Sequence, residues 1–537
     1  MSIPLIDLVV IIVYLVGVTG VGLLSVRRMK LTGEVYFLAG RALPWGIVGA
    51  ALFSSNISTI HLVGLAEAGY KHGLVIGNFE WMATFTLILL ALVFAPFYYR
   101  TRIATLPEFL ERRYGPAVRS IVAGMAIAAA LLIHIGISLY AGAAVFREFF
   151  GVNVIVSIVL IAVITAIYTV IGGLRAVVIT ETIQTAVLLI GAVIVTGLAF
   201  AALPGHGIDS LAAFREAVKP DQLSMLHTSN DAGFAWYAIF LGYPVLGIWY
   251  WCTDQTIVQR VLGARTERDA QHGALFAGLL KILPVFIMVL PGVVAWVLFR
   301  DRIGVDATQT LPLLIRELVP TGLRGLIAAA LLAALMSTIA AALNSSGTLV
   351  AVDIARRLKP GLSDRQQVRI GRVSAVVVML LAMAWSTQGH RFDSIFEAIN
   401  KMPAQFLAPP ITAVFLWGVF WRRGTREAAL ATLVLGFSLG VVAFLVDLPV
   451  IGDTQLITEG LGVSFMMQAW WGFCICSGIF VIASLLTPAP PREQVEGVTW
   501  ETPWQVIAHG RIEGISDPRV LAGLLLLLMV VLYTVFR

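Results

Sequence analysis

Long apolar runs, separated by short polar segments, repeat along almost the whole chain. A helix needs about 20 mostly apolar residues to cross the hydrocarbon core of a bilayer, and these runs meet that length. The pattern therefore predicts an all-α polytopic membrane protein with about fourteen transmembrane helices. The predicted spans cover residues 4–26, 43–70, 77–99, 118–146, 153–172, 176–203, 234–258, 272–299, 322–351, 370–388, 395–420, 427–446, 466–487 and 519–536.

The composition supports this class of protein. Of the 537 residues, 59% are hydrophobic and only 13% are charged, whereas soluble domains carry about 25% charged residues. The formal net charge of +6 does not indicate a nucleic-acid partner, because the Lys and Arg residues lie in short loops and form no basic stripe. No HExxH motif, paired Asp or Ser/His nucleophile arrangement lies within the spans, so the sequence does not indicate an enzyme.

The loop charges predict the orientation in the membrane. About two thirds of the 37 Lys and Arg residues fall in the loops on one side of the predicted spans, and cytoplasmic loops favour these residues. This pattern places the N-terminus and the C-terminus outside, in a plasma membrane that we expect to be a bacterial inner membrane. No positive charge precedes the first apolar run and RRMK (27–30) follows it, which is typical of a span rather than a cleaved leader.

Two of the predicted spans are interrupted by residues that do not suit a continuous membrane helix. The second carries the polar stretch FSSNISTIH (53–61), and the seventh carries Pro244 between Gly242 and Gly247. Proline removes a backbone donor and glycine loosens a helix, so one reading of the seventh span is an ordinary kink. However, the two interruptions lie five spans apart, and interrupted helices at matching places in two halves indicate a transporter with inverted repeats and a mid-membrane site.

Several stretches in the same order resemble the sodium/solute symporter family, and within it the sodium/glucose cotransporter branch. They are spread over most of the chain, which makes the set far more specific than any one of them. The stretches are SSNISTIHLVGLAEAGY (54–70), NFEWMA (78–83), TLPEFLERRYG (105–115), YTVIGGLRAVVITETIQ (168–184), IWYWCTDQTIVQRVLGA (248–264), LLKILPVFIMVLPG (279–292), ALMSTIAAALNSSGTLVAVDI (334–354) and APPITAVFLWGVFWRR (408–423).

The resemblance implies a LeuT-like fold, in which five plus five helices form two inverted repeats with broken first and sixth core helices. It also implies sodium-coupled uptake of a small solute by alternating access. The whole chain is then one transporter domain in the lipid bilayer. Its expected parts are an extra N-terminal helix (4–30), a first repeat (43–203), a second repeat (234–446) and two extra C-terminal helices (466–537).

The resemblance also implies a sodium site where the broken first core helix meets the eighth. A hard cation prefers oxygen ligands, and an unwound helix frees carbonyl groups to supply them. The implied sodium ligands are the backbone carbonyls of Ser54 and Ile57 together with Ala334, Ser337 and Thr338, with Glu181 on the sodium exit path. Family members with a second sodium site build it from hydroxyls just after this pair. Ala340 and Ala341 stand there in this chain, which predicts one sodium per solute.

The implied solute site contains ionisable residues at membrane depth. A charge at the centre of a bilayer costs about 2.5–3.5 kcal/mol on insertion scales, so Glu80 and Lys281 are expected to face the protein interior or a cavity. The implied substrate-binding residues are Asn56, His61, Glu80, His134, Tyr250, Trp251, Lys281 and Asn400, and the implied gates are Leu65, Phe79, Tyr250 and Phe396.

Departures from the family pattern leave the solute open. Gly247 stands where a bacterial sugar transporter of the branch has a sugar-binding amide, and Asn400 stands where Gln is usual. A hexose or polyol is the favoured solute. The alternative is a carboxylate solute such as a monocarboxylate, sialic acid or an amino acid, although Glu80 disfavours an anion. A sodium-independent channel is a further alternative that an alternating-access scaffold disfavours.

Overall fold

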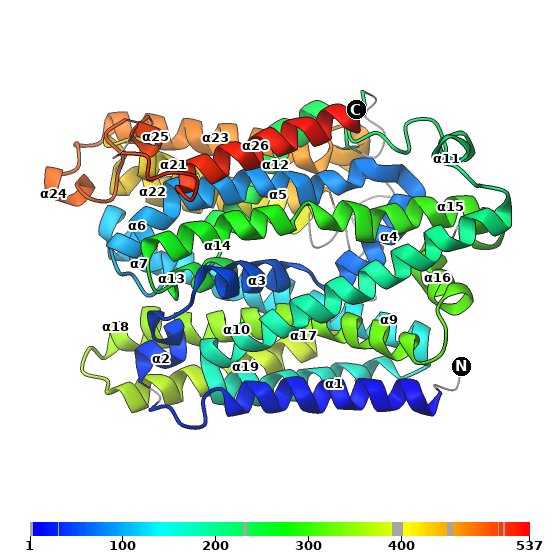
Figure 1. The fold of residues 1–537 in the computed structure, drawn as a ribbon. Helices are drawn as coiled ribbons and strands as arrows, with labels where there is room; N and C mark the ends of the chain where they lie inside the picture. Colours follow the sequence, from blue (N-terminus) through cyan, green and yellow to red (C-terminus); the bar gives the residue numbers. More distant parts are fainter. Residues whose placement is uncertain are drawn as a thin grey trace.

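The computed structural model describes residues 4–30, 32–228, 233–304, 306–388, 401–447, 455–502, 504–508 and 511–537. Over these residues the chain is almost entirely helical, and no strand occurs among them. Figure 1 shows most helices running roughly parallel in one elongated bundle, with α1 (Leu5–Leu24) along one edge and α26 (Pro518–Val535) along the opposite edge. The predicted all-α class is therefore confirmed.

Eleven of the described helices are long and apolar enough to cross a membrane, so the count of about fourteen spans is not confirmed. The predicted spans 153–172 and 176–203 fall in one long helix, and the predicted second and seventh spans are each divided into two short helices. The main helices besides α1 and α26 are α3 (Trp45–Asn56), α4 (Thr59–His72), α5 (Asn78–Leu89), α6 (Ala95–Arg100), α8 (Pro116–Ala129), α9 (Ser138–Phe150), α10 (Val154–Ala202), α12 (Trp236–Gly247), α13 (Gln255–Leu262), α14 (Glu267–Leu280), α15 (Leu290–Ile303), α17 (Leu323–Leu349), α19 (Asp364–Ser386), α21 (Ala408–Phe420), α22 (Arg426–Val446) and α23 (Phe465–Leu486).

The outer helices expose apolar side chains, as lipid contact requires. Leu5 and Val16 on α1, Val442 on α22 and Leu527 on α26 are all more than half exposed. A soluble protein rarely leaves apolar surface of this extent uncovered. The distribution of exposed apolar residues therefore agrees with a protein that lies in a bilayer.

Helix α17 occupies the centre of the bundle. Every residue from Ile327 to Leu349 is buried, and the helix packs along α10, α1 and α19. Its many alanines leave room for close approach of neighbouring backbones, which is how helices commonly associate in membranes. The same helix carries Ser337 and Thr338, so these two hydroxyls lie deep inside the protein.

The two predicted interruptions are real, but the second lies elsewhere than expected. Between α3 and α4 the backbone is extended at Ile57 and Ser58. In the seventh span the helix continues through Pro244 into a π-helical turn (Ile248–Thr253), and the extended residue is Asp254. The assignment of this break to Pro244 was therefore wrong, because membrane helices tolerate a proline whose freed carbonyl finds other partners.

The glycines beside Pro244 serve close packing rather than helix opening. A Cβ atom on Gly242 would lie 2.2 Å from the carbonyl oxygen of Met466 on α23. A Cβ atom on Gly247 would lie 2.7 Å from Cγ2 of Thr86 on α5. Position 242 thus needs a residue without a side chain, because the clash is with backbone, whereas a side chain at position 247 would require Thr86 to shift.

The long helix α10 has a kink at Gly173. This residue has φ 62° and ψ −157°, a conformation that costs glycine little and other residues much. A Cβ atom there would also lie 2.4 Å from the carbonyl oxygen of Tyr36. A straight helix of 49 residues would be about 73 Å long, far more than the roughly 30 Å of a bilayer core, and the glycine divides it into two spans.

Both ends of the chain lie at the same end of the bundle. The Oδ1 atom of Asp7 accepts hydrogen bonds from the backbone N–H groups of Gly322 and Gly325, at the start of α17. The carbonyl oxygen of Phe536 accepts from the N–H group of Met225, at a distance of 2.6 Å. Figure 1 places both ends toward the side of α11 (Leu211–Ala217) and α16 (Thr310–Leu318). The division into repeats at 43–203 and 234–446 stays a prediction.

Candidate functional site

A cavity lies at the centre of the bundle, where the breaks after α3 and before α13 approach α5, α14 and α17. Its volume, taken as the space open to the centre of a water molecule, is about 130 Å³. One water needs about 10–15 Å³ on the same scale. The cavity therefore has room for several waters or a small solute. Its lining comprises Asn56, Ser58, His61, Leu65, Phe79, Glu80, Ile133, His134, Ser138, Tyr243, Leu246, Gly247, Trp249, Tyr250, Trp251, Lys281, Thr338 and Pro403.

Every predicted substrate-binding residue that the structure describes lines this cavity. Leu65, Phe79 and Tyr250, three of the four predicted gates, line it as well. Asn400 and Phe396 lie outside the described residues. The structure thus brings together residues from five predicted spans, while their individual roles stay predictions.

A buried ion pair forms one wall of the cavity. The Nζ atom of Lys281, directly after α14, donates to Oε2 of Glu80 at 2.5 Å and also to Oδ1 of Asn56. The side chains of Lys281 and Glu80 are 1% and 2% exposed. Each charge compensates the other, because an unpaired buried charge would be costly. The same ammonium lies 5.3 Å from the ring centroid of Trp251, a cation–π distance.

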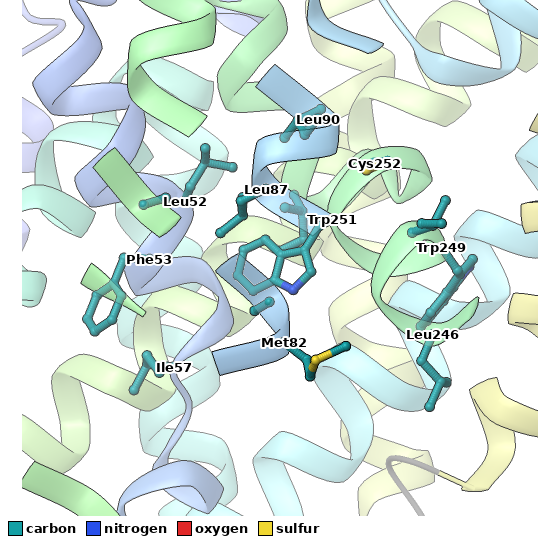
Figure 2. Close-up of a cluster of buried hydrophobic side chains, with 14 of the residues drawn as sticks. Leu52, Phe53, Ile57, Met82, Leu87, Leu90, Leu246, Trp249, Trp251 and Cys252 are labelled. Atoms are coloured by element: carbon teal, nitrogen blue, oxygen red, sulfur yellow. The ribbon is translucent and has the colours of Figure 1, made fainter. Parts of the chain in front are cut away.

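Trp251 anchors this wall in the hydrophobic core. Figure 2 shows its indole between Leu52 and Phe53 of α3 on one side and Trp249 on the other. The residue lines the cavity but is only 2% exposed, so most of it is covered by other residues. Burial of this large ring holds the π-helical turn (Ile248–Thr253) against α3.

The start of α4 directs His61 toward Glu80. The Nδ1 atom of His61 accepts a hydrogen bond from the backbone N–H group of Ser58 at 3.1 Å. This bond satisfies one of the free donors at the helix start. Its Nε2 atom lies 3.9 Å from Oε1 of Glu80. The polar break predicted from the sequence therefore aims an imidazole at the ion pair.

A second histidine lies on the other side of the cavity. The Nε2 atom of His134, on a π-helical turn (Ala130–Ile137) between α8 and α9, lies 2.8 Å from Oδ2 of Asp254. Trp249 stacks on the imidazole at an interplanar angle of 9°, and Tyr250 approaches it at 5.8 Å between ring centroids. These contacts fix the plane of the His134 ring.

Aromatic residues close the cavity beside Phe79. The hydroxyl of Tyr243 donates to the carbonyl oxygen of Phe79 at 2.8 Å. Phe465 stacks on the Phe79 ring with a centroid distance of 6.1 Å, and Phe234 meets its edge. Phe79 is therefore held by aromatic neighbours from three other segments.

Four of the five predicted sodium ligands lie at one contact between α3 and α17. The hydroxyl of Ser337 donates to the carbonyl oxygens of Ser54 at 2.8 Å and Ala334 at 2.9 Å. The hydroxyl of Thr338 lies 3.2 Å from the Ala334 carbonyl oxygen, and Thr338 also lines the cavity. Ile57 is buried in extended backbone at the end of α3. Carbonyl and hydroxyl oxygens are the ligands that a hard cation prefers.

Glu181 forms a fully buried ion pair next to these residues. It accepts from the hydroxyl of Ser55 at 2.9 Å and from Nη2 of Arg260 at 2.5 Å. The side chains of Glu181 and Arg260 are both 0% exposed. Arg175 lies only six residues from Glu181 in the sequence, but the cation that pairs with Glu181 is Arg260. Glu181 and Ser337 therefore contact the consecutive residues Ser55 and Ser54.

Sequence reasoning missed Ser58, Tyr243, Asp254 and Arg260. Asp254 had a usable signal, because an ionisable residue inside a predicted span is a functional candidate by default, whereas Arg260 lies just beyond the predicted span 234–258. They stand in the stretch CTDQTIVQR (252–260), which served only to support the family resemblance. Ser58 and Tyr243 carried no such signal, since a hydroxyl in a membrane helix commonly bonds to its own backbone.

Comparisons with known proteins agree with this architecture. Residues 36–436 match the sodium:solute symporter family. A sodium/mannose cotransporter of Bos taurus is 37% identical over 93% of this chain and 90% of its own length. A sodium/myo-inositol cotransporter 2 of Oryctolagus cuniculus is 33% identical over 92% of this chain and 79% of its own.

Solved structures confirm the fold. A Na+-coupled sialic acid symporter in a substrate-bound outward-open state superposes with a TM-score of 0.76 at 23% identity, over 91% of this chain and 99% of that one. MhsT in complex with L-phenylalanine superposes with a TM-score of 0.51 at 15% identity, over 82% of this chain and 97% of that one. The predicted LeuT-like architecture is therefore confirmed, and the chain belongs to the sodium:solute symporter family.

Proposed function

We propose that this protein imports a neutral sugar or polyol together with sodium, by alternating access around the central cavity. The single observation that carries the choice of solute is charge compensation. Of the cavity-lining residues that the structure describes, the one Lys or Arg side chain, Lys281, is paired with the one carboxylate, Glu80. A cavity with balanced charges and many hydrogen-bonding groups suits a polyhydroxylated solute. The sugar and polyol cotransporters among the relatives support the same choice.

Within this proposal, Asn56, His61, Glu80 and Lys281 bond the solute hydroxyls, and Asn400 completes the set. Tyr250 offers its ring face to the apolar face of a sugar as the inner gate, and Trp251 contributes to the wall of the site. Leu65, Phe79 and Phe396 form the outer gate. This assignment rests on the family resemblance and, for the residues that the structure describes, on the shared cavity.

Sodium is the coupled ion in this proposal and binds the oxygens of Ser54, Ile57, Ala334, Ser337 and Thr338. The Ser337 hydroxyl bridges α3 and α17 through the Ser54 carbonyl. A sodium ion there would tie the same two helices together more strongly than one hydrogen bond. Because Thr338 also lines the cavity, an ion at this place would influence the solute-binding state.

A carboxylate solute is the alternative from the same family. It would need a positive group or helix N-terminus free to receive the anion. Among the described residues that line the cavity, the one Lys or Arg side chain is Lys281, and it is already paired. The neutral solute is therefore preferred.

The orientation that we propose places both termini outside the plasma membrane. It rests on the excess of Lys and Arg in the opposite loops, and on the position of both ends at one end of the bundle.

The test is uptake by the purified full-length protein in liposomes. Labelled mannose, glucose, myo-inositol, sialic acid and lactate are compared with an inward sodium gradient, and with potassium in place of sodium. We expect sodium-dependent accumulation of at least one neutral compound and none of the two acids. Accumulation of an acid alone would contradict the neutral solute, and equal flux without sodium would indicate a channel.

A further inference from the structure

His134 and Asp254 form a dyad with two features that together fix its chemistry. The first is that Asp254 caps α13, because its Oδ1 atom accepts from the backbone N–H group of Thr256 at 2.6 Å. The second is that its other oxygen, Oδ2, faces Nε2 of His134 at 2.8 Å. Both side chains are about 93% buried, at 7% exposure each. One oxygen of the carboxylate thus accepts a hydrogen bond from the helix start, and the other faces the imidazole.

This contact determines which nitrogen of His134 carries the proton. A carboxylate can only accept hydrogen bonds, so Nε2 of His134 must be the donor. In a neutral imidazole the other nitrogen, Nδ1, is then an acceptor. Since His134 lines the cavity, its free hydrogen-bonding capacity is that of an acceptor.

His61 is bonded through the other ring nitrogen, Nδ1. Its Nδ1 atom accepts from the backbone N–H group of Ser58, which can only donate. Nε2 of a neutral His61 therefore carries the proton and is a donor, on the side where Glu80 lies 3.9 Å away. Both neutral histidines are therefore the Nε2–H tautomer, but the nitrogen that remains for a solute is the acceptor in His134 and the donor in His61.

We propose that Asp254 is a positioning residue that holds His134 as a hydrogen-bond acceptor, so that the cavity selects a solute hydroxyl that donates to His134 and another that accepts from His61. This inference rests on the proposed function, because it specifies which hydrogen bonds recognise a polyhydroxylated neutral solute. A solute group that only accepts, such as a fluorine or an ether oxygen, is rejected at the His134 position.

The variant Asp254→Asn reverses the His134 tautomer without losing the helix cap. Asn caps helices about as well as Asp. The Thr256 N–H group still requires an acceptor, so the amide oxygen takes the place of Oδ1 and the amide nitrogen faces His134. A donor then opposes Nε2, and the proton of the neutral imidazole moves to Nδ1. Asp517→Asn is the matched control, since Asp517 caps α26 in the same way through the N–H group of Arg519 and does not line the cavity.

The first measurement needs no solute. Nitrogen-15 NMR of the purified full-length protein, labelled at histidine, separates protonated from unprotonated imidazole nitrogens, and His134→Gln identifies the His134 signals. We expect an unprotonated Nδ1 in the wild type and in Asp517→Asn, and a protonated Nδ1 in Asp254→Asn. A wild-type His134 with a protonated Nδ1 and an unprotonated Nε2 overturns the proposal, even if Asp254→Asn fails to fold.

The second measurement tests how the cavity recognises the solute hydroxyls. Binding affinity in saturating sodium is compared for the transported solute and for analogues with a single hydroxyl replaced by fluorine, which cannot donate. For one position we expect a loss of about tenfold in the wild type, as for one lost hydrogen bond, and at most about twofold in Asp254→Asn. The same tenfold loss in both proteins overturns the proposal. A wild type that binds no sugar or polyol contradicts the proposed function instead, and the nitrogen spectrum then decides this inference alone.

Discussion

Two buried ion pairs of the same chemistry lie on either side of helix α3 and differ in their access to space. Asn56 contacts the Glu80–Lys281 pair, which lines the central cavity. The preceding residue, Ser55, contacts the Glu181–Arg260 pair, which lines none of the described cavities. Consecutive residues at the end of one helix thus separate a pair that a solute can reach from a pair that it cannot reach.

The difference in access indicates a difference in role. Water or solute hydroxyls in the cavity can replace the contacts between Glu80 and Lys281, so that pair can open during transport. Arg260 also donates to the carbonyl oxygen of Thr256 and is completely buried, so it has no alternative partner in solvent. We therefore expect the first pair to govern the solute, and the second to stabilise the protein and to set the potential near the sodium ligands.

The largest expected effect is on stability. Arg260→Met leaves the Glu181 carboxylate buried without a cation, which costs about 3–5 kcal/mol. Lys281→Met leaves Glu80 beside a cavity that water can enter, so we expect less than half of that loss. Denaturation of the two purified variants in detergent measures the difference. Equal destabilisation would show that the cavity does not hydrate Glu80.

The next effect is on transport. Glu80→Gln keeps the shape of the side chain but leaves Lys281 unpaired and removes a solute acceptor, a change worth about 2–5 kcal/mol. We expect uptake to fall at least about 100-fold, with the protein still folded. The matched variant Glu181→Gln is expected to keep a substantial part of the uptake. A Glu80→Gln variant with unchanged affinity for its solute would place the solute site elsewhere.

Tyr250 tests the aromatic side of the cavity. An aromatic contact contributes about 0.5–1.5 kcal/mol beyond area burial, so Tyr250→Ala should raise the half-saturating solute concentration about tenfold. Tyr250→Phe keeps the ring and should raise it no more than about threefold. Concentration-dependent uptake separates the two variants. If alanine is tolerated as well as phenylalanine, Tyr250 does not contact the solute.

The smallest expected effect concerns sodium. Glu181→Gln removes one charge near the sodium ligands while Arg260 remains. An electrostatic change of about 1 kcal/mol corresponds to about fivefold weaker sodium activation, and solute affinity in saturating sodium should not change. Sodium titrations of uptake measure this directly. A sodium dependence identical to the wild type would remove Glu181 from the sodium path.

Much of this architecture could be predicted from the sequence. Apolar runs of membrane length and polar residues inside them follow directly from the physics of a bilayer, and they located the break after Asn56. The family resemblance supplied the residues that line the cavity. The predicted boundary between residues 172 and 176 agrees with the kink at Gly173, but the break of the seventh span was placed at Pro244 and not at Asp254.

Partner choice was the part that sequence could not reveal. Glu181 pairs with Arg260, 79 positions away, and not with nearby Arg175. His134 meets Asp254 across 120 positions. Such contacts depend on the packing of helices from distant segments. The break was predicted at Pro244 for a related reason. Proline usually interrupts a helix, but a membrane helix can continue through it where neighbouring groups bond the freed carbonyl.

The neutral-solute, single-sodium account can be tested by the number of charges that cross the membrane with each solute. One site looks complete, because Ala340 and Ala341 offer no side-chain oxygen and Glu181 already has a cation beside it. One sodium moving down about 100 mV and a tenfold gradient releases about 3.7 kcal/mol, enough for about 500-fold accumulation of a neutral solute.

The most direct measurement is the ratio of charge to solute flux in liposomes, taken from the membrane potential at which net transport reverses for known sodium and solute gradients. The account predicts one positive charge and one sodium for each solute. An electroneutral cycle would indicate a monovalent anion carried with one sodium. Two charges for each solute would show that a second cation binds. Either result would contradict a neutral solute coupled to a single sodium ion.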